Sequence, residues 1–147
     1  MIYGIFQTGF QDNLEKLPYF NKNTAGILLV KEGINLDRKI ERLIKSGYFL
    51  RLKNGLYTTK TYLLTVGNKE KYGESLVSAL CYPSYLSLEY VLAAAGLIPE
   101  AIQIYTGITL KSTRSFQNFL GRFSYQNVNS KLFCGFIDGK ASVAKAL

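Results

Sequence analysis

Basic side chains concentrate in one short stretch of this sequence, residues 38–53. The stretch holds six lysines and arginines against a single acidic residue, Glu41, which leaves a net charge of +5. A cluster of this charge can neutralise the phosphates of a polyanion and release their condensed counterions. A solvated basic face without a ligand is the alternative interpretation. The six residues are Arg38, Lys39, Arg42, Lys45, Arg51 and Lys53.

The rest of the composition argues against several kinds of active site. The 147 residues include no histidine and two cysteines, which excludes a Ser-His-Asp triad and imidazole metal ligands. Cys81 and Cys134 have apolar neighbours and are expected to be buried, reduced thiols. Glu70, Glu74 and Glu89 are spread too widely in the sequence to be predicted as paired catalytic carboxylates. We therefore expect no enzyme activity, no catalytic residue, no metal and no cofactor.

Two helices are predicted ahead of the basic stretch. Apolar residues at helical spacing indicate a first helix that ends near Pro18. A second, short helix is predicted over residues 25–32, with Asn23 and Thr24 as its N-cap and Gly33 as its end. The apolar residues of the first helix are Phe6, Phe10, Leu14 and Leu17.

The basic stretch itself begins in a third predicted helix, residues 37–46, which Gly47 ends. At about 100° per residue, one side of its helical wheel is apolar and the opposite side is basic. Asp37 and Glu41 fall between these two sides. The apolar side holds Leu36, Ile40, Leu43 and Ile44. The basic side holds Arg38, Arg42 and Lys45, with Lys39 at its edge.

A β-hairpin is predicted directly after the third helix. Two strand-like segments, residues 48–53 and 56–59, flank Asn54-Gly55, and this dipeptide favours the positive φ angles of a type I′ turn. Arg51 and Lys53 would then lie on the face opposite the apolar residues. A two-residue turn pairs Leu52 with Tyr57 and Leu50 with Thr59.

A helix–turn–helix followed at once by such a hairpin is typical of the winged-helix arrangement. Its third helix can enter the major groove of DNA, while the hairpin, or wing, contacts the backbone. The alternative is a winged-helix module that contacts only proteins. In the DNA-binding interpretation, Arg38, Lys39, Arg42 and Lys45 contact bases or phosphates, and Arg51, Lys53 and Asn54 hold the wing against the backbone.

The remainder of the chain, residues 61–147, is predicted to be a small α+β domain with an antiparallel sheet. Helices are predicted over residues 69–80 and 88–95, the second introduced by Pro83-Ser84 and capped by Ser87. Strands are predicted to start near residue 101 and to occupy residues 115–120, 122–128 and 131–137. The many aromatic residues of this half are expected to form the sheet core rather than a base-stacking platform.

Three stretches resemble the AbiEi family of antitoxins and transcriptional regulators of type IV toxin–antitoxin systems. The most specific is residues 83–99, PSYLSLEYVLAAAGLIP, in which a Ser-initiated helix runs into a Gly-Leu-Ile-Pro stop. The winged element, residues 43–57 (LIKSGYFLRLKNGLY), and the last seven residues, 141–147 (ASVAKAL), also carry the likeness. Ala144 stands where the family usually has a glutamate.

This resemblance implies a DNA-binding domain over residues 1–60 that represses its own operon. Residues 61–147 are then an antitoxin-type domain that is incomplete at its C-terminus, because family members usually continue into further helices. The functional partner implied is a nucleotidyltransferase-like toxin, opposed without a stable complex. Double-stranded operator DNA is the expected ligand, and a homodimer on DNA is compatible with inverted half-sites.

Two further expectations concern alternatives and location. A third hypothesis, an enzyme acting on nucleotides, requires Glu89, Glu100 or Asp138 to gather around a divalent ion.

No apolar stretch approaches the roughly 20 residues of a membrane span, and the N-terminus lacks a signal-peptide pattern. The protein is therefore expected to be cytoplasmic and to have no membrane partner.

Overall fold

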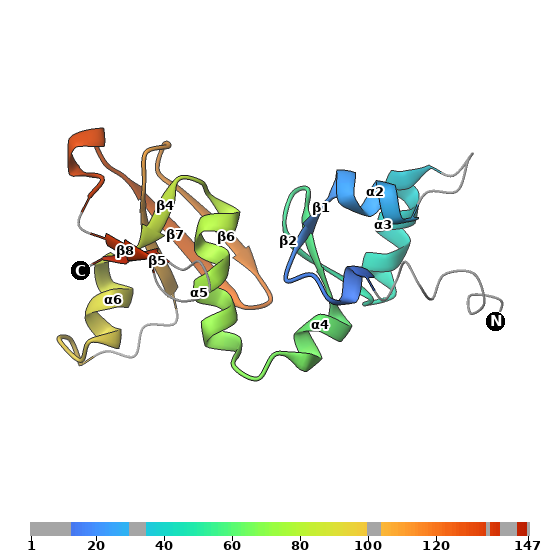
Figure 1. Ribbon diagram of the computed structural model, residues 1–147, viewed down its shortest axis with the longest axis horizontal. Coiled ribbons are helices and arrows are strands. Elements are labelled where there is room, and N and C mark those ends of the chain that lie inside the picture. Colours follow the sequence, from blue (N-terminus) through green and yellow to red (C-terminus); the bar gives the residue numbers. More distant parts are fainter. Residues whose placement is uncertain (1–12, 30–34, 100–103, 135, 139–143, 147) are drawn as a thin grey trace. The chain divides into compact units, whose positions relative to one another are not determined.

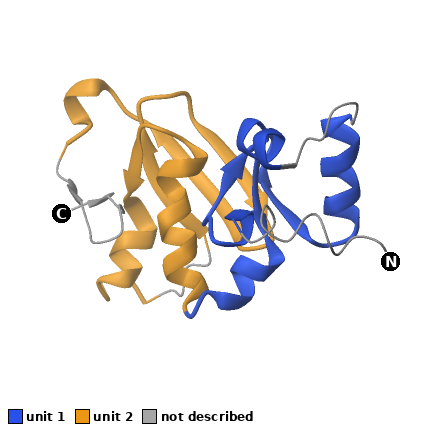
Figure 2. Ribbon diagram, turned by 45° about the vertical axis from the view of Figure 1, so that its right-hand side comes forward, with its two compact units in different colours: residues 1–67 blue, residues 68–147 orange. Residues whose placement is uncertain are grey.

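The chain forms an α+β structure in two compact units, residues 1–67 and 68–147 (Figures 1 and 2). The first unit contains a three-stranded antiparallel sheet and the second a six-stranded mixed sheet. The structure is a computed structural model, and it describes residues 13–29, 35–99, 104–134, 136–138 and 144–146. The division after Gly67 places the helix α4 (Lys60–Thr65) in the first unit, whereas the sequence predicted a boundary at residue 60 and no helix there.

The first unit packs short helices against its sheet, whose strand order is β1-β3-β2. Residues 13–15 are helical, and this helix ends before Pro18 as predicted; Phe6 and Phe10 lie outside the described residues. The other helices besides α4 are α2 (Lys22–Leu29) and α3 (Leu36–Lys45). The strands are β1 (Phe20–Asn21), β2 (Phe49–Lys53) and β3 (Leu56–Thr59).

Helix α2 begins earlier than predicted. The side-chain oxygen of Asn21 accepts the backbone N–H of Thr24 at 2.8 Å, so Asn21 takes the capping role that the sequence assigned to Asn23 and Thr24. Residue 32 and Gly33, where this helix was predicted to end, lie outside the described residues.

An aromatic cluster forms the core of the first unit. The rings of Phe20 and Phe49 meet edge to face with centroids 5.0 Å apart, and Tyr57 stacks on Phe49, a geometry that adds to the free energy of burial. Ile40 of α3 is 3% exposed and belongs to the same cluster. The other members are Leu14 and Ala25, and Leu36, Leu43 and Ile44 pack against them. The predicted apolar side of α3 is therefore confirmed.

The hairpin forms as predicted, but its register differs. Lys53 pairs with Leu56 across the turn, after which the register shifts, so that Arg51 pairs with Tyr57. Leu52 is the extra residue of this β-bulge. The predicted pairs Leu52–Tyr57 and Leu50–Thr59 are therefore wrong: Thr59 pairs with Phe49 and Thr58 with Leu50.

The second unit is built around a sheet of order β6-β7-β5-β4-β9-β8. Its helices are α5 (Lys69–Leu80), α6 (Leu88–Ala94) and the short 3-10 helix η1 (Ser130–Leu132). Its strands are β4 (Ser84–Leu86), β5 (Ile104–Thr109), β6 (Arg114–Asn118), β7 (Gly121–Asn127), β8 (Phe136–Asp138) and β9 (Ala144–Ala146). The predicted α5, α6, β6 and β7 are confirmed to within about two residues at each end.

Three details of the second unit correct the sequence prediction. The sheet is mixed, because the chain runs from β5 to the edge strand β6 before returning as β7, which pairs parallel to β5; β4 and β9 are also parallel. Pro83-Ser84 leads into the strand β4 and not into a helix. The predicted strand over residues 131–137 is divided between η1 and β8.

Two side chains also differ from expectation. Ser87 makes no side-chain cap to α6. Instead, α6 is capped by the hydroxyl of Thr106, which lies on β5. This hydroxyl accepts the N–H of Tyr90 at 2.9 Å and donates to the carbonyl of Ser87 at 2.6 Å. Cys81 is buried, as predicted, but Cys134 is exposed.

Tyrosine rings dominate the core of the second unit. Tyr105 lies between Tyr90 and Phe123, with ring centroids 5.2 and 4.6 Å away. Burial raises the pKa of the Tyr125 phenol, whose O–H donates to the carbonyl of Val77 on α5 at 2.6 Å. This buried hydrogen bond ties the helix to β7.

We expect Gly73→Ala to destabilise the protein by about 1–3 kcal/mol, because a methyl group at Gly73 would overlap the ring of Tyr105, which its stacked neighbours hold in place. Thermal unfolding followed by circular dichroism measures the loss. Gly67→Ala is the control, since a Cβ added there would meet no atom within 4 Å apart from those of its two chain neighbours. Equal melting temperatures for the two variants would contradict this packing.

Candidate nucleic-acid interface

Both ends of α3 are fixed by local hydrogen bonds. At its start, the side-chain oxygen of Asn35 accepts the N–H groups of Asp37 and Arg38 at 3.0 and 3.3 Å. At its end, Gly47 adopts a φ of 80°, and the N–H of Tyr48 returns to the carbonyl of Leu43 at 3.0 Å. This is a Schellman motif, and it directs the chain from α3 straight into β2.

The face of α3 opposite the core is basic. Arg38, Arg42 and Lys45 are all exposed, whereas Ile40 is buried, so the wheel predicted from the sequence describes the folded helix. These three exposed residues form a basic stripe. From Arg38 to Lys45 the stripe extends about 10 Å along the helix axis, at about 1.5 Å per residue. Lys39, predicted at the edge of the stripe, is half-buried.

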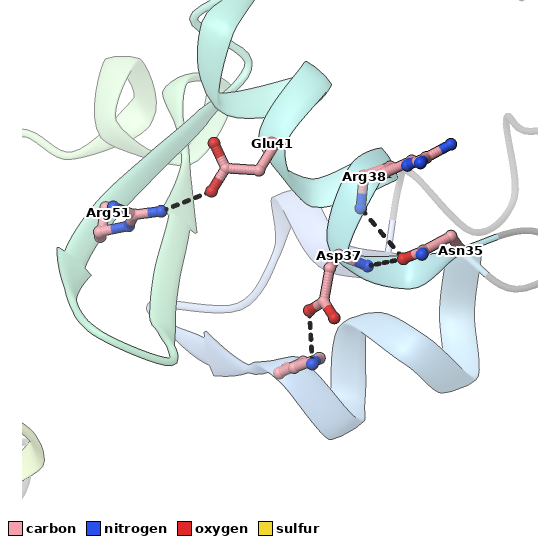
Figure 3. A network of polar contacts seen from close by, with 6 residues as sticks. Asn35, Asp37, Arg38, Glu41 and Arg51 are labelled. Carbon is pink, nitrogen blue, oxygen red and sulfur yellow. Dashed lines mark hydrogen bonds and ion pairs between the residues drawn. The ribbon is translucent and has the colours of Figure 1, made fainter.

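The two acidic residues of α3 pair with neighbouring elements and not with this stripe. Asp37 Oδ1 lies 2.5 Å from Lys22 Nζ on α2, and Glu41 Oε1 lies 3.0 Å from Arg51 Nη2 on β2 (Figure 3). The guanidinium of Arg38 points away from both pairs. Among the described residues, Arg38, Arg42 and Lys45 take part in no ion pair. Their positive charge is therefore available to an anion.

The basic and polar residues of the hairpin differ from one another in exposure and in pairing, whereas the sequence predicted the same role for all of them. Arg51 is exposed but is paired with Glu41, and Lys53 is half-buried. Asn54 and Gly55 are exposed at the tip of the hairpin. Gly55 has a φ of 81°, but Asn54 is not among the residues with positive φ, so the turn is not type I′. The structure thus brings Arg51 beside α3 and leaves Asn54 at the tip.

A second polar cluster lies in the second unit, where the sequence predicted none. The phenol of Tyr90 lies 2.8 Å from Glu74 Oε1 and 3.2 Å from Glu70 Oε1. The two carboxylates are four residues apart on α5, a spacing that places them on one helix face. The sequence prediction set Glu70 and Glu74 aside as too widely spread to pair, and the structure corrects it, because both lie within hydrogen-bond distance of the same phenol. Burial and the hydrogen bond to Glu74 raise the pKa of Tyr90. The phenol therefore stays protonated, and its single O–H is shared between the two carboxylates, with the shorter contact to Glu74.

The carboxylates considered for a divalent ion are not gathered by the part of the chain that the structure describes. Glu89 is exposed on α6, Glu100 lies outside the described residues, and only the backbone of Asp138 is described. Within the described ranges, no group of three or more potential metal ligands occurs, and no helix there has the length and apolar character needed to cross a bilayer.

Comparisons with protein-family models, with curated proteins and with solved structures find no match for this chain. The geometry of α3 and of the hairpin is therefore the basis for proposing a function.

Removing the cap of α3 tests how the candidate interface is held. We expect Asn35→Ala to lower the free energy of unfolding by about 1 kcal/mol, because two N–H groups lose their acceptor. Urea denaturation measures the difference, and Asn35→Asp should retain the cap. Asn23→Ala is the matched control, expected to change stability by less than about 0.5 kcal/mol. An equal loss for both alanine variants would contradict the assignment of the cap to Asn35.

Proposed function

We propose that this protein is a DNA-binding transcriptional regulator whose first unit binds duplex DNA as a winged helix. Helix α3 is the recognition helix, and the β2–β3 hairpin is the wing. The observation that carries the proposal is the exposed stripe of Arg38, Arg42 and Lys45, whose acidic neighbours on the same helix are paired elsewhere. A stripe of this kind is an electrostatic footprint for a polyanion.

The dimensions of the stripe agree with the major groove. That groove is about 12 Å wide and accommodates an α-helix, and the stripe covers about 10 Å, or roughly three base pairs at about 3.4 Å each. Recognition helices read bases with their N-terminal residues, a position that Arg38 occupies. An arginine there can donate two hydrogen bonds to one guanine, while Arg42 and Lys45 contact bases or phosphates.

The wing adds contacts to the DNA backbone in this proposal. Asn54 is exposed at the hairpin tip, and Arg51 and Lys53 lie on the strand that leads to it. Lys39, at the edge of the stripe, approaches the phosphates on one side of the groove. These contacts position the helix without reading sequence.

The resemblance to the AbiEi family supports a more specific role. In this role the protein represses its own operon and counteracts a nucleotidyltransferase-like toxin without forming a stable complex with it. A homodimer on DNA would match two inverted half-sites. The competing hypothesis is that the winged-helix module binds only proteins. A module of that kind would have no salt-dependent affinity for DNA.

The double variant Arg42→Ala/Lys45→Ala tests the proposal. We expect it to weaken binding to the DNA upstream of the protein's own gene by at least about tenfold near 0.1 M salt. The slope of log affinity against log salt should fall by about two, since about 0.9 counterions are released per phosphate contact. Its melting temperature should stay near that of the wild type, because both side chains are exposed. Fluorescence anisotropy across a salt series provides the measurement.

Lys69→Ala/Lys71→Ala is the matched control. It removes the same charge from two exposed positions of α5 in the second unit, and we expect its affinity for DNA to change by less than about twofold. Equal losses for the two double variants would assign the effect to net charge. An unchanged affinity of the α3 variant, or wild-type binding that does not depend on salt, would favour the protein-binding module.

A further inference from the structure

The ion pair between Glu41 and Arg51 joins the two elements of the proposed interface. Arg51 Nη2 donates to Glu41 Oε1 at 3.0 Å (Figure 3), and the two side chains are 44% and 55% exposed. The pair is therefore open to solvent and to any polyanion that approaches α3. Exposed pairs of this kind are weak enough to exchange partners readily.

The position of Glu41 conflicts with simple phosphate binding. On the helical wheel its carboxylate falls within about 60° of Arg38 and Lys45. A phosphate that reaches the basic stripe therefore comes near a negative charge, which lowers its affinity. In the free protein, Arg51 neutralises this charge. The same guanidinium belongs to the hairpin, and the structure defines its ion pair with α3.

We propose that Glu41 is a positioning residue that holds Arg51 beside α3 in the free protein and releases it to a DNA phosphate on binding. The inference rests on the proposed function. The N–H of Arg51 that is donated to the carboxylate of Glu41 is then donated to a phosphate oxygen. Glu41 thus aligns the wing before DNA arrives and limits affinity for DNA that does not bring a phosphate to Arg51.

A double-mutant cycle in DNA binding tests this exchange. We expect Glu41→Gln to raise the affinity for the upstream duplex about three- to tenfold near 0.1 M salt, since both the competing ion pair and the repulsive charge are removed. In the Arg51→Ala background the ion pair is already absent. The same substitution should therefore raise affinity about two- to fivefold less than it does in the wild type.

The coupling between Glu41 and Arg51 is called positive when Glu41→Gln raises affinity more in the wild type than in the Arg51→Ala background, and the inference requires a positive coupling. A gain from Glu41→Gln that is equal or larger in the Arg51→Ala background means that Arg51 stays on Glu41 in the complex, and this overturns the inference. An unchanged or reduced affinity of Glu41→Gln overturns it as well.

Two controls separate this test from that of the proposed function. Glu89→Gln removes the same charge from an exposed position on α6, and we expect its affinity to change by less than about twofold. If the Arg42→Ala/Lys45→Ala variant binds as the wild type does, the proposed function fails together with this inference. If that variant is weakened but the cycle shows no positive coupling, the inference alone fails.

Discussion

The burial of one side of α3 is the constraint on which the rest of the first unit depends. Ile40 enters the aromatic cluster around Phe20, Phe49 and Tyr57, and it fixes the rotation of the helix about its own axis. Because side chains recur every 3.6 residues, this rotation also fixes which residues face solvent. A slip of the helix by one residue would turn Ile40 out of the core and carry the basic stripe about 100° away from its present direction.

The solvent-facing side of α3 carries both acidic residues, which are paired, and the basic residues of the stripe. Both carboxylates of α3 lie toward neighbouring elements that supply a cation, Lys22 on α2 for Asp37 and Arg51 on β2 for Glu41. These exposed pairs contribute little stability, but they determine where positive charge remains. The same hairpin that brings Arg51 to the helix also supplies Phe49 and Tyr57 to the core. The hairpin therefore contributes both to the packing of α3 and to the pairing of Glu41. The proposed interface depends on the hairpin even where the hairpin does not touch DNA.

Most features of the fold that depend on residues close together in the sequence were predicted, and most features that depend on residues far apart in the sequence were not. The helix α3, its amphipathic character and the two hairpin strands were predicted, because periodicity and the Asn-Gly turn are local signals. The bulge at Leu52 was missed, since it depends on which side chains the finished core accepts. Other misses have the same origin: Thr106 caps α6 from a distant strand, and β7 inserts beside β5 in parallel. At the candidate site, the basic residues were found from the sequence, but the pairing of Arg51 with Glu41 was not.

In the proposed function, the exposed face of α3 and the adjoining hairpin contact duplex DNA. The most direct measurement is an NMR titration of the labelled full chain with the DNA upstream of its own gene, following backbone amide shifts and the Arg38, Arg42 and Arg51 side-chain N–H signals. We expect the largest changes in residues 36–46 and 51–55, with the arginine signals shifted and the amides of α5 unaffected. Changes confined to the second unit, or an absence of change in α3 at saturating DNA, would contradict the account.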